Sequence, residues 1–402
     1  MLGVIDRCFE LIAQQTRGEP LQRAGERPAL HGFRCDDPAV YALLCAADTV
    51  GVFQVESRAQ ISACLPHLQP RCYEDLIVAV ALIRPGPIQG NATQPYLRRR
   101  RGEEPIRYPG GEAGRRLLEP ILGETLGVCL YQDQVIAIGT ACGLSPSEAA
   151  ALRRAMSGAR GSERMAALRV RLEAGLAAQG LDAAARADVL SMVQAFAGYG
   201  FVKGHAAAFA YLAYVSCWLK VYHPAAFYAA LLNMQPMGFY PPEVLLQDAE
   251  RPGVRVLPVD VRDSRADCTL EGGALRLGLR LVRGLGLDAC ARLEEALAAS
   301  PPPRDLEELC TRACLHEDEA RALAWSGALR GYIPERRQAL WQAPPVARAA
   351  RERWLPALLA AADPPVWLPA PTPSPAPPCG SPRTGRWTCT WGRPSSARAR
   401  VR

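Results

Sequence analysis

Two basic side chains stand at the start of a long apolar segment, directly after a glycine-rich turn. Lys203 and His205 follow Gly198 and Gly200 and precede a run of alanine and aromatic residues that predicts a helix. The first turn of a helix has free backbone N–H groups and the positive end of the helix dipole, so anions bind there. The pattern favours a phosphate site, and a buried helix with two incidental polar residues is the alternative.

A second basic pair, Arg153 and Arg154, ends a helical pattern in the word LRRAM at 152–156. An arginine guanidinium is a planar fork that donates hydrogen bonds to phosphate oxygens in pairs, so this word also suits a phosphate. Adjacent positions on a helix point about 100° apart, and we therefore expect one arginine to dominate the contact. The plainer alternative is a solvated basic face of a helix.

The third candidate is a turn between two helical patterns, in the segment VRGLGLDACARLEEAL at 282–297. Gly284 and Gly286 would permit a tight turn and a close approach to a DNA phosphate, with Arg283 beside them. Such a contact binds the DNA backbone without reading the bases. A Gly-x-Gly pair alone is common in turns, but the flanking helices and a second helical pair at 305–332 predict helix-hairpin-helix elements.

Mostly helical segments with glycine and proline punctuation must position these residues. We expect helices over 1–65, where Asp37 caps a helix that begins at Pro38. A mostly helical domain with a few short strands follows over 66–215, and it includes a hairpin-like segment at 126–135.

The chain changes character after about residue 345. Prolines are frequent from Pro364 to Pro382, and residues 383–402 have neither helical nor strand periodicity. Such a composition cannot bury enough apolar surface to offset chain entropy, so we expect residues 346–402 to be disordered. We favour a shifted reading frame as the origin of this tail, and the alternative is a genuine proline-rich linker with a basic end.

The net charge of +7 comes largely from the tail, because residues 383–402 hold six arginines and no acid. Affinity for DNA must therefore come from local patches, such as the arginine run at 98–101 unless that run is a solvated loop. No apolar run could span a membrane and the start has no signal-peptide pattern, so we expect a cytoplasmic protein. Cys310, Cys314 and His316 lack the second ligand pair of a zinc site.

Several long words of the sequence resemble one known family. They are QAFAGYGFVKGHAAAF at 194–209, GVFQVESR at 51–58 and LLNMQPMGFYPPEVLLQDAERPGVRVLPVDV at 231–261. These words resemble bacterial family C DNA polymerases, the alpha-subunit type of DNA polymerase III, and the last resembles their error-prone branch. The resemblance runs from about Gly3 to about Ala343.

This resemblance implies a mainly α fold with short β segments. The expected parts are a palm-to-fingers junction at 1–65 and a fingers domain at 66–215. A tandem helix-hairpin-helix DNA-binding domain is expected at 216–345. Residues 346–402 would then be a low-complexity tail, disordered or frame-shifted.

The resemblance also implies roles for the basic residues. Arg153 and Arg154 would hold the triphosphate of the incoming nucleotide. Lys203 and His205 would join them there or at the template–primer backbone. The RPGP turn around Arg84 would shape the surroundings of the nascent base pair and contact DNA, although a rigid turn with a surface arginine is nearly as good an interpretation.

Polymerase chemistry needs carboxylates that converge on Mg²⁺ ions. The sequence has no Asp-x-Asp, and its closest acidic groups are Asp36–Asp37, Glu74–Asp75 and Glu317–Glu319. The first resembles a helix cap and the last a solvated helix face. In the family, the metal-binding carboxylates belong to the palm, before the region matched here.

We therefore expect a fragment of an error-prone, DNA-directed DNA polymerase that is inactive by itself. Its ligands would be primer–template DNA and a deoxynucleoside triphosphate (dNTP) during damage-tolerant synthesis, with Mg²⁺ held outside this chain. Other subunits of damage-tolerance polymerases are expected as further partners, and no membrane is. The alternative is a non-catalytic DNA-binding remnant or module.

Overall fold

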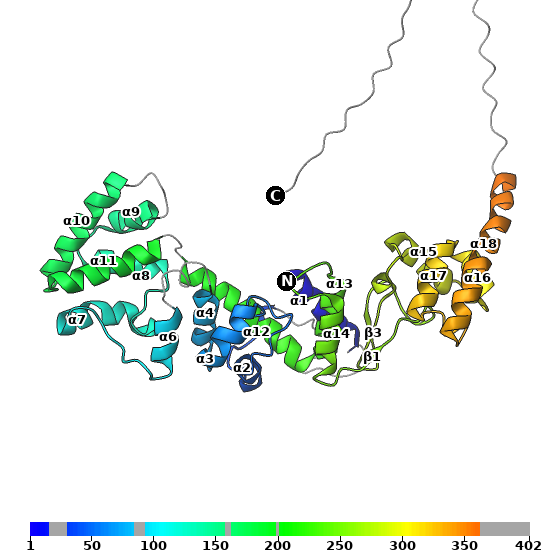
Figure 1. Ribbon diagram of the computed structural model, residues 1–402, viewed down its shortest axis with the longest axis horizontal. Helices are drawn as coiled ribbons and strands as arrows, with labels where there is room; N and C mark the ends of the chain where they lie inside the picture. The colour runs from blue at the N-terminus through cyan, green and yellow to red at the C-terminus, as the bar shows by residue number, and fades with distance from the viewer. Residues whose placement is uncertain (16–29, 84–92, 157–161, 198–200, 362–402) are drawn as a thin grey trace, which may run out of the picture. The chain divides into compact units, whose positions relative to one another are not determined.

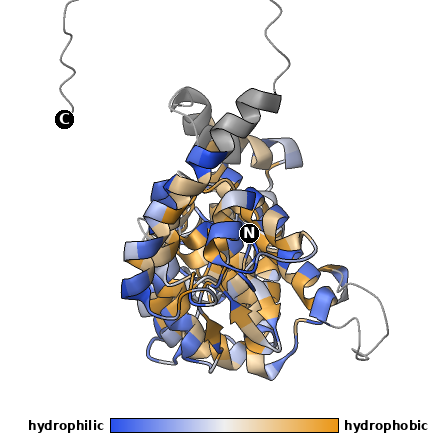
Figure 2. Cartoon of the chain, turned by 90° about the vertical axis from the view of Figure 1, so that its right-hand side faces the viewer, coloured by the Kyte–Doolittle hydropathy of each residue, from blue (hydrophilic) through white to orange (hydrophobic). Residues whose placement is uncertain are grey.

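Three groups of buried apolar side chains hold this mostly helical chain together, which confirms the predicted fold class. The computed structural model describes the backbone of residues 1–15, 30–83, 93–156, 162–197 and 201–361, and their side chains except those of 152–166, 194–197 and 354–361. Residues 1–354 form one compact unit. Figure 2 shows hydrophobic residues gathered inside the packed helices and hydrophilic ones on outward ribbons.

The first core joins side chains that lie between residues 4 and 275. Its longest helix, α12 (Lys203–Tyr222), packs against α4 (Tyr73–Leu82), α2 (Pro38–Cys45) and α13 (Pro224–Asn233) (Figure 1). Buried alanines at 206, 210 and 213 share one face of α12 and allow its neighbours to approach closely. The other elements are α1 (Leu2–Gln15), η1 (Leu30–Gly32), η2 (Gln60–Cys64), α3 (Leu65–Leu68), α6 (Thr93–Arg100) and α14 (Pro242–Glu250).

A small three-stranded sheet closes one side of this core. Its strands are β1 (Val256–Leu257), β2 (Thr269–Glu271) and β3 (Ala274–Arg276), in the order β1-β3-β2. β1 runs parallel to β3 and β2 antiparallel to it. The fully buried side chain of Leu275, in β3, packs in the first core.

The second core lies between residues 118 and 193 and is entirely helical. Its elements are α7 (Gly111–Leu122), η3 (Gly123–Thr125), α8 (Gln132–Ala141), α9 (Pro146–Met156), α10 (Ser162–Ala178) and α11 (Ala183–Ala197). The hairpin expected at 126–135 is wrong. The Gln134 side chain accepts the N–H groups of Leu130 and Tyr131 at 2.8 and 3.0 Å, so this segment needs no strand partner.

The third core lies between residues 261 and 350. It contains η4 (Leu279–Leu281), α15 (Leu287–Ala298), α16 (Leu306–Arg312), α17 (Glu317–Ser326) and most of α18 (Arg336–Ala361). The helical pair predicted at 305–332 is confirmed. Around 282–297 the turn leads into α15 as predicted, but the element before the turn is the three-residue 3-10 helix η4. Residues 346–361, expected to be disordered, are helical, because buried alanines at 339, 343, 347 and 350 anchor α18 to this core. The rest of the expected tail lies outside the described residues.

Local end signals in the sequence correspond to real helix ends. Asp37 caps α2 by accepting the Ala39 N–H at 2.8 Å, with Pro38 in the first helical position. The predicted boundary at residue 215, in contrast, lies inside α12, which continues to Tyr222. Within the described ranges, none of the helices combines the length and apolar character that a bilayer crossing requires.

Candidate nucleic-acid interface

Lys203 opens α12, as its position in the sequence predicts, but it is already paired. Its Nζ donates to Glu124 at 2.6 Å and lies 5.9 Å from the ring centroid of Tyr131. Its backbone N–H donates to the carboxylate of Asp133 at 3.0 Å. Two carboxylates thus occupy positions where a phosphate was expected, and an incoming anion would compete with Glu124 for this half-exposed lysine.

His205 is exposed and lies among aromatic rings. Its ring centroid is 4.1 Å from that of Phe209, one helical turn later, and 5.2 Å from that of Phe201 at an interplanar angle of 89°. Phe209 in turn meets Phe53 at 5.2 Å. The structure therefore brings Lys203 and His205 to the same helix end, but gives them different surroundings.

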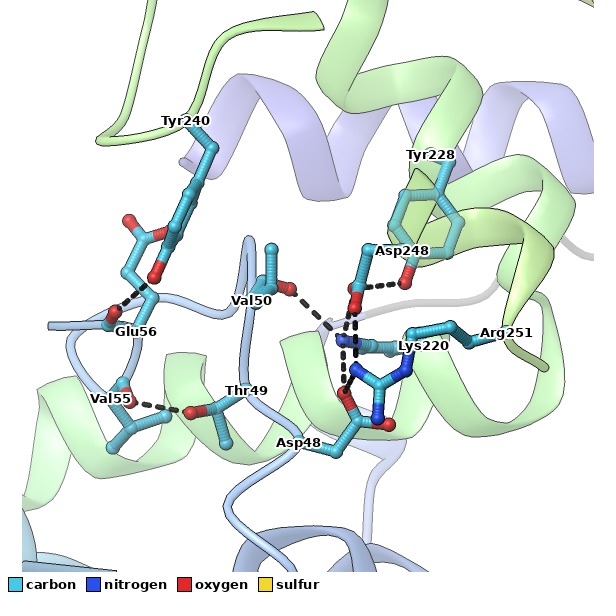
Figure 3. A network of polar contacts seen from close by, with 10 residues as sticks. All are labelled: Asp48, Thr49, Val50, Val55, Glu56, Lys220, Tyr228, Tyr240, Asp248 and Arg251. Carbon is cyan, nitrogen blue, oxygen red and sulfur yellow. Dashed lines mark hydrogen bonds and ion pairs between the residues drawn. The ribbon is translucent and has the colours of Figure 1, made fainter. Parts of the chain in front are cut away.

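The segment that carries Phe53, residues 48–56, is held by a buried network (Figure 3). Lys220, only 3% exposed, donates to Asp48 at 3.1 Å, to the Val50 carbonyl at 3.2 Å and to Asp248 at 2.8 Å. The hydroxyl of Thr49 donates to the Val55 carbonyl at 2.7 Å. We call this segment, Asp48 to Glu56, the anchored loop.

Two acids of this network have shifted pKa values of opposite sign. Burial acts to raise the pKa of Asp248, but hydrogen bonds from Lys220 and Tyr228 outweigh it and hold that pKa below its ordinary value. Burial raises the pKa of Glu56 to about 7, although the Gly51 N–H acts in the other direction. Asp248 is therefore a structural anion, whereas Glu56 changes its charge near neutral pH.

The predicted Gly-x-Gly turn forms between η4 and α15. Arg283, Gly284 and Gly286 are all exposed, and Arg283 makes no hydrogen bond or ion pair with any described residue. Gly284 has φ +93°, a left-handed conformation that requires glycine. Gly286 caps α15 with φ −77° and ψ 163°, which any residue adopts, so the turn itself does not require this second glycine. A Cβ at Gly286 would meet no atom within 4 Å, which leaves its outer side open.

The arginine run at 98–101 is neither a free basic patch nor a solvated loop. Arg98 and Arg99 donate to Glu104 at 3.0 and 3.1 Å, Arg100 to Asp75 at 2.6 Å and Arg101 to Glu103 at 2.6 Å. Each of the four arginines thus has an acidic partner, although Arg98 and Arg99 share Glu104 and three carboxylates leave one net positive charge. The expectation fails because two of the acids follow the run closely and the third is packed against it from α4.

For the remaining predicted site residues, the structure describes the backbone alone, or the residue lies outside the described ranges. Arg153 and Arg154 lie in the last turn of α9, as predicted, but their side chains are not among those described. Arg84 lies outside the described residues.

Two parts of the chain match known protein families. Residues 1–180 match the bacterial DNA polymerase III alpha subunit finger domain, and residues 253–339 match a helix-hairpin-helix motif. The chain therefore contains the finger domain of the bacterial DNA polymerase III alpha subunit, followed by a helix-hairpin-helix motif. The resemblance stated from the sequence is confirmed.

Curated relatives carry the name error-prone DNA polymerase. That of Alkalilimnicola ehrlichii is 47% identical over 85% of this chain and 32% of its own length. That of Anaeromyxobacter sp. strain K is 45% identical over 92% of this chain and 33% of its length. The Pseudomonas paraeruginosa protein is 45% identical over 85% of this chain and 32% of its own length. The chain thus spans about a third of the length of these polymerases.

The described carboxylates do not fit the Mg²⁺ pair that polymerases of this family would use. No three His, Cys, Asp or Glu side chains among the described residues are grouped so that they could hold a metal ion. The three acidic groups seen in the sequence serve the fold instead. Asp37 caps a helix, Asp75 binds Arg100, and Glu319 accepts the His316 N–H at 2.8 Å and binds Arg292. The expected solvated face at Glu317–Glu319 holds for Asp318, which is 89% exposed, whereas Glu319 serves as a helix cap and Glu317 makes surface ion pairs.

Sequence reasoning missed the partners of the basic residues. Glu124 and Asp133 lie 79 and 70 positions from Lys203, and no motif links them to it. The ring cluster carries a partial signal, because aromatic side chains at 201, 205 and 209 recur with a spacing of one helical turn. The fourth ring, Phe53, comes from a distant segment and has no such signal.

Proposed function

We propose that this chain provides the DNA- and nucleotide-binding fingers and the helix-hairpin-helix part of an error-prone DNA polymerase. The observation that carries the proposal is an identity of 45–47% to proteins of that name over 85–92% of the chain. The ligands would be primer–template DNA and a dNTP, during damage-tolerant synthesis in the bacterial cytoplasm. Other subunits of damage-tolerance polymerases would be its partners.

The basic residues divide into two groups in this proposal. Arg153 and Arg154, at the end of α9, would bind the triphosphate, and Lys203 would join them after exchanging Glu124 for phosphate. Arg283 with Gly284 and Gly286 would bind the backbone of duplex DNA, and Arg84 would contact DNA near the nascent pair. His205 would lie at the same nucleotide or at the template–primer backbone.

The metal-binding carboxylates would come from outside this chain. We expect the chain alone to extend no primer, and a fusion that places the palm region of a relative before Met1 to extend one when Mg²⁺ and dNTPs are present. Primer extension on a labelled template measures this. A fusion that folds and binds DNA without extending the primer would contradict the polymerase proposal and leave a DNA-binding module.

The hairpin contact makes a separate prediction for duplex binding. Arg283→Ala should weaken binding about equally for all DNA sequences, because a phosphate contact carries no base information. The slope of log K against log salt should become shallower by about one. Fluorescence anisotropy with two duplexes of unrelated sequence, over a salt series, measures both effects.

Arg321→Ala is the matched control for this prediction. Arg321 is also a surface arginine of the third core, but it is paired with Glu317 and Asp318 at 2.7 Å. Its loss should leave the salt slope unchanged. A loss of affinity for only one of the two sequences after Arg283→Ala would exclude the backbone contact.

A further inference from the structure

Four aromatic rings form a continuous series at the start of α12. Phe201 meets His205 edge-on, His205 lies against Phe209, and Phe209 lies against Phe53 at 35° between ring planes. The series joins three segments: the anchored loop, the residues before α12, and the first two turns of α12. Such a series offers π-faces and ring edges over a longer distance than any one side chain covers.

This series differs from an ordinary part of the core in its exposure. Phe201 is buried, but His205 is exposed, and Phe53 and Phe209 are half-buried. Phe53 is not among the side chains packed against the first core, and its ring packs against that of Phe209. The residue after it, Gln54, has φ +64°, in the left-handed region. The loop thus presents an aromatic side chain at the surface at some conformational cost.

The anchored loop is fixed on both sides of Phe53 (Figure 3). Before it, Lys220 binds Asp48 and the Val50 carbonyl. After it, the Tyr240 hydroxyl donates to the Glu56 carbonyl at 2.8 Å. Keeping a lysine buried for this purpose is costly unless its partners hold it well. A ring held in this way loses little conformational entropy when a flat ligand stacks on it.

The charges around the series favour a neutral ligand face over a phosphate. At the start of α12, Lys203 is paired with exposed Glu124, and exposed Asp133 accepts the Lys203 N–H. A phosphate at this helix end would meet these two carboxylates. The face of a nucleobase is uncharged, and every base stacks on aromatic side chains.

We infer that Phe53 and His205, supported by Phe209, form a stacking surface for an unpaired nucleobase of DNA. The inference rests on the proposed DNA-binding function and assigns a base-binding part to it. His205 then contacts the base through its ring rather than a phosphate through its charge. Lys220 is a positioning residue, because it acts through the loop that carries Phe53.

The test compares two labelled single strands that have the same length and number of phosphates. One is oligothymidine and the other an abasic strand, and both are titrated with the full chain at one low salt concentration. The wild-type chain should bind the strand with bases at least about fivefold more tightly. Phe53→Leu should reduce that ratio by about fivefold, and Phe53→Tyr, which keeps the ring, should preserve it. His205→Ala should lower the ratio and His205→Phe should keep it.

Phe239→Leu is the matched control, because Phe239 is 74% exposed and makes no ring contact with a described residue. It should leave the ratio unchanged. A ratio that Phe53→Leu does not change, or an equal loss for both strands, would overturn the stacking surface. Equal wild-type binding to the two strands would also overturn it while leaving DNA binding intact. Absence of wild-type binding to both single strands, with binding to duplex DNA retained, would overturn the stacking surface alone. Absence of binding to the single strands and to duplex DNA would reject the proposed function itself.

Discussion

Lys220→Met should lower the free energy of unfolding by about 3–5 kcal/mol, because it leaves two carboxylates without their buried cation. The Lys220 ammonium binds Asp248, only 6% exposed, and Asp48, and no other described cation reaches both from within the core. Methionine keeps most of the side-chain volume, so the loss reports on charge rather than on packing. Urea unfolding followed by circular dichroism at pH 7 measures it.

Arg251→Ala provides the matched control for this substitution. Arg251 binds the same two acids, at 3.0 and 3.5 Å, but its side chain is 65% exposed. Solvent-exposed ion pairs contribute about 0–1 kcal/mol, so this variant should lose no more than that. Equal losses for the two variants would show that burial of Lys220 does not govern the stability of the network.

A double substitution tests whether the loss of stability in Lys220→Met comes from leaving the buried Asp248 carboxylate without its cation. Lys220→Met combined with Asp248→Leu removes both buried charges, and it should recover part of the stability that Lys220→Met loses. The Tyr228 hydroxyl then loses its acceptor, so the recovery is incomplete. A double variant less stable than Lys220→Met alone would mean that Asp248 has a separate structural role.

The network also fixes how stability responds to acid. The pKa of Asp248 is lowered in the folded chain, so its contribution is fully present above the ordinary pKa of an aspartate. It is lost as the pH falls through the lower, folded pKa. The wild-type chain should therefore be destabilised by acid in part through this one carboxylate.

Features set by neighbours in sequence could be predicted, and features set by distant partners could not. The cap at Asp37, the end of α9 after Arg153 and Arg154, and the turn at Gly284 all depend on a few adjacent residues. The same locality explains why the helices of the third core were predicted well.

The errors come from side chains that meet across long stretches of chain. The four arginines at 98–101 look basic in sequence, but Asp75 on another helix takes one of them. The Gln134 side chain accepts the backbone N–H groups of residues 130 and 131, so these groups need no partner strand of a hairpin. Phe53 reaches Phe209 only because Lys220, Thr49 and Tyr240 anchor its loop, and no spacing rule contains that arrangement.

Glu56→Gln should stabilise the chain above neutral pH and leave it unchanged near pH 4.5. Burial raises the pKa of Glu56 from 4.5 to about 7. Between these two values the unfolded chain releases the proton while the folded chain keeps it, so wild-type stability falls as the pH rises through this window. The fall should be about 2 kcal/mol, less than the full shift implies because the Gly51 N–H and remaining solvent soften the penalty. Glutamine has no proton to release, so its curve should stay flat there.

Glu243→Gln is the matched control, since Glu243 is exposed and should not alter the pH dependence. Urea unfolding of the three chains at pH 4.5, 6 and 8 measures the difference. Parallel wild-type and Glu56→Gln curves would mean that Glu56 does not keep its proton in the folded chain.

Glu56 is the last residue of the anchored loop, which carries Phe53. If wild-type stability falls above neutral pH, we therefore also expect the loop to hold the Phe53 ring less firmly above neutral pH. The base preference of the wild-type chain should then decline between pH 6 and 8, while that of Glu56→Gln persists.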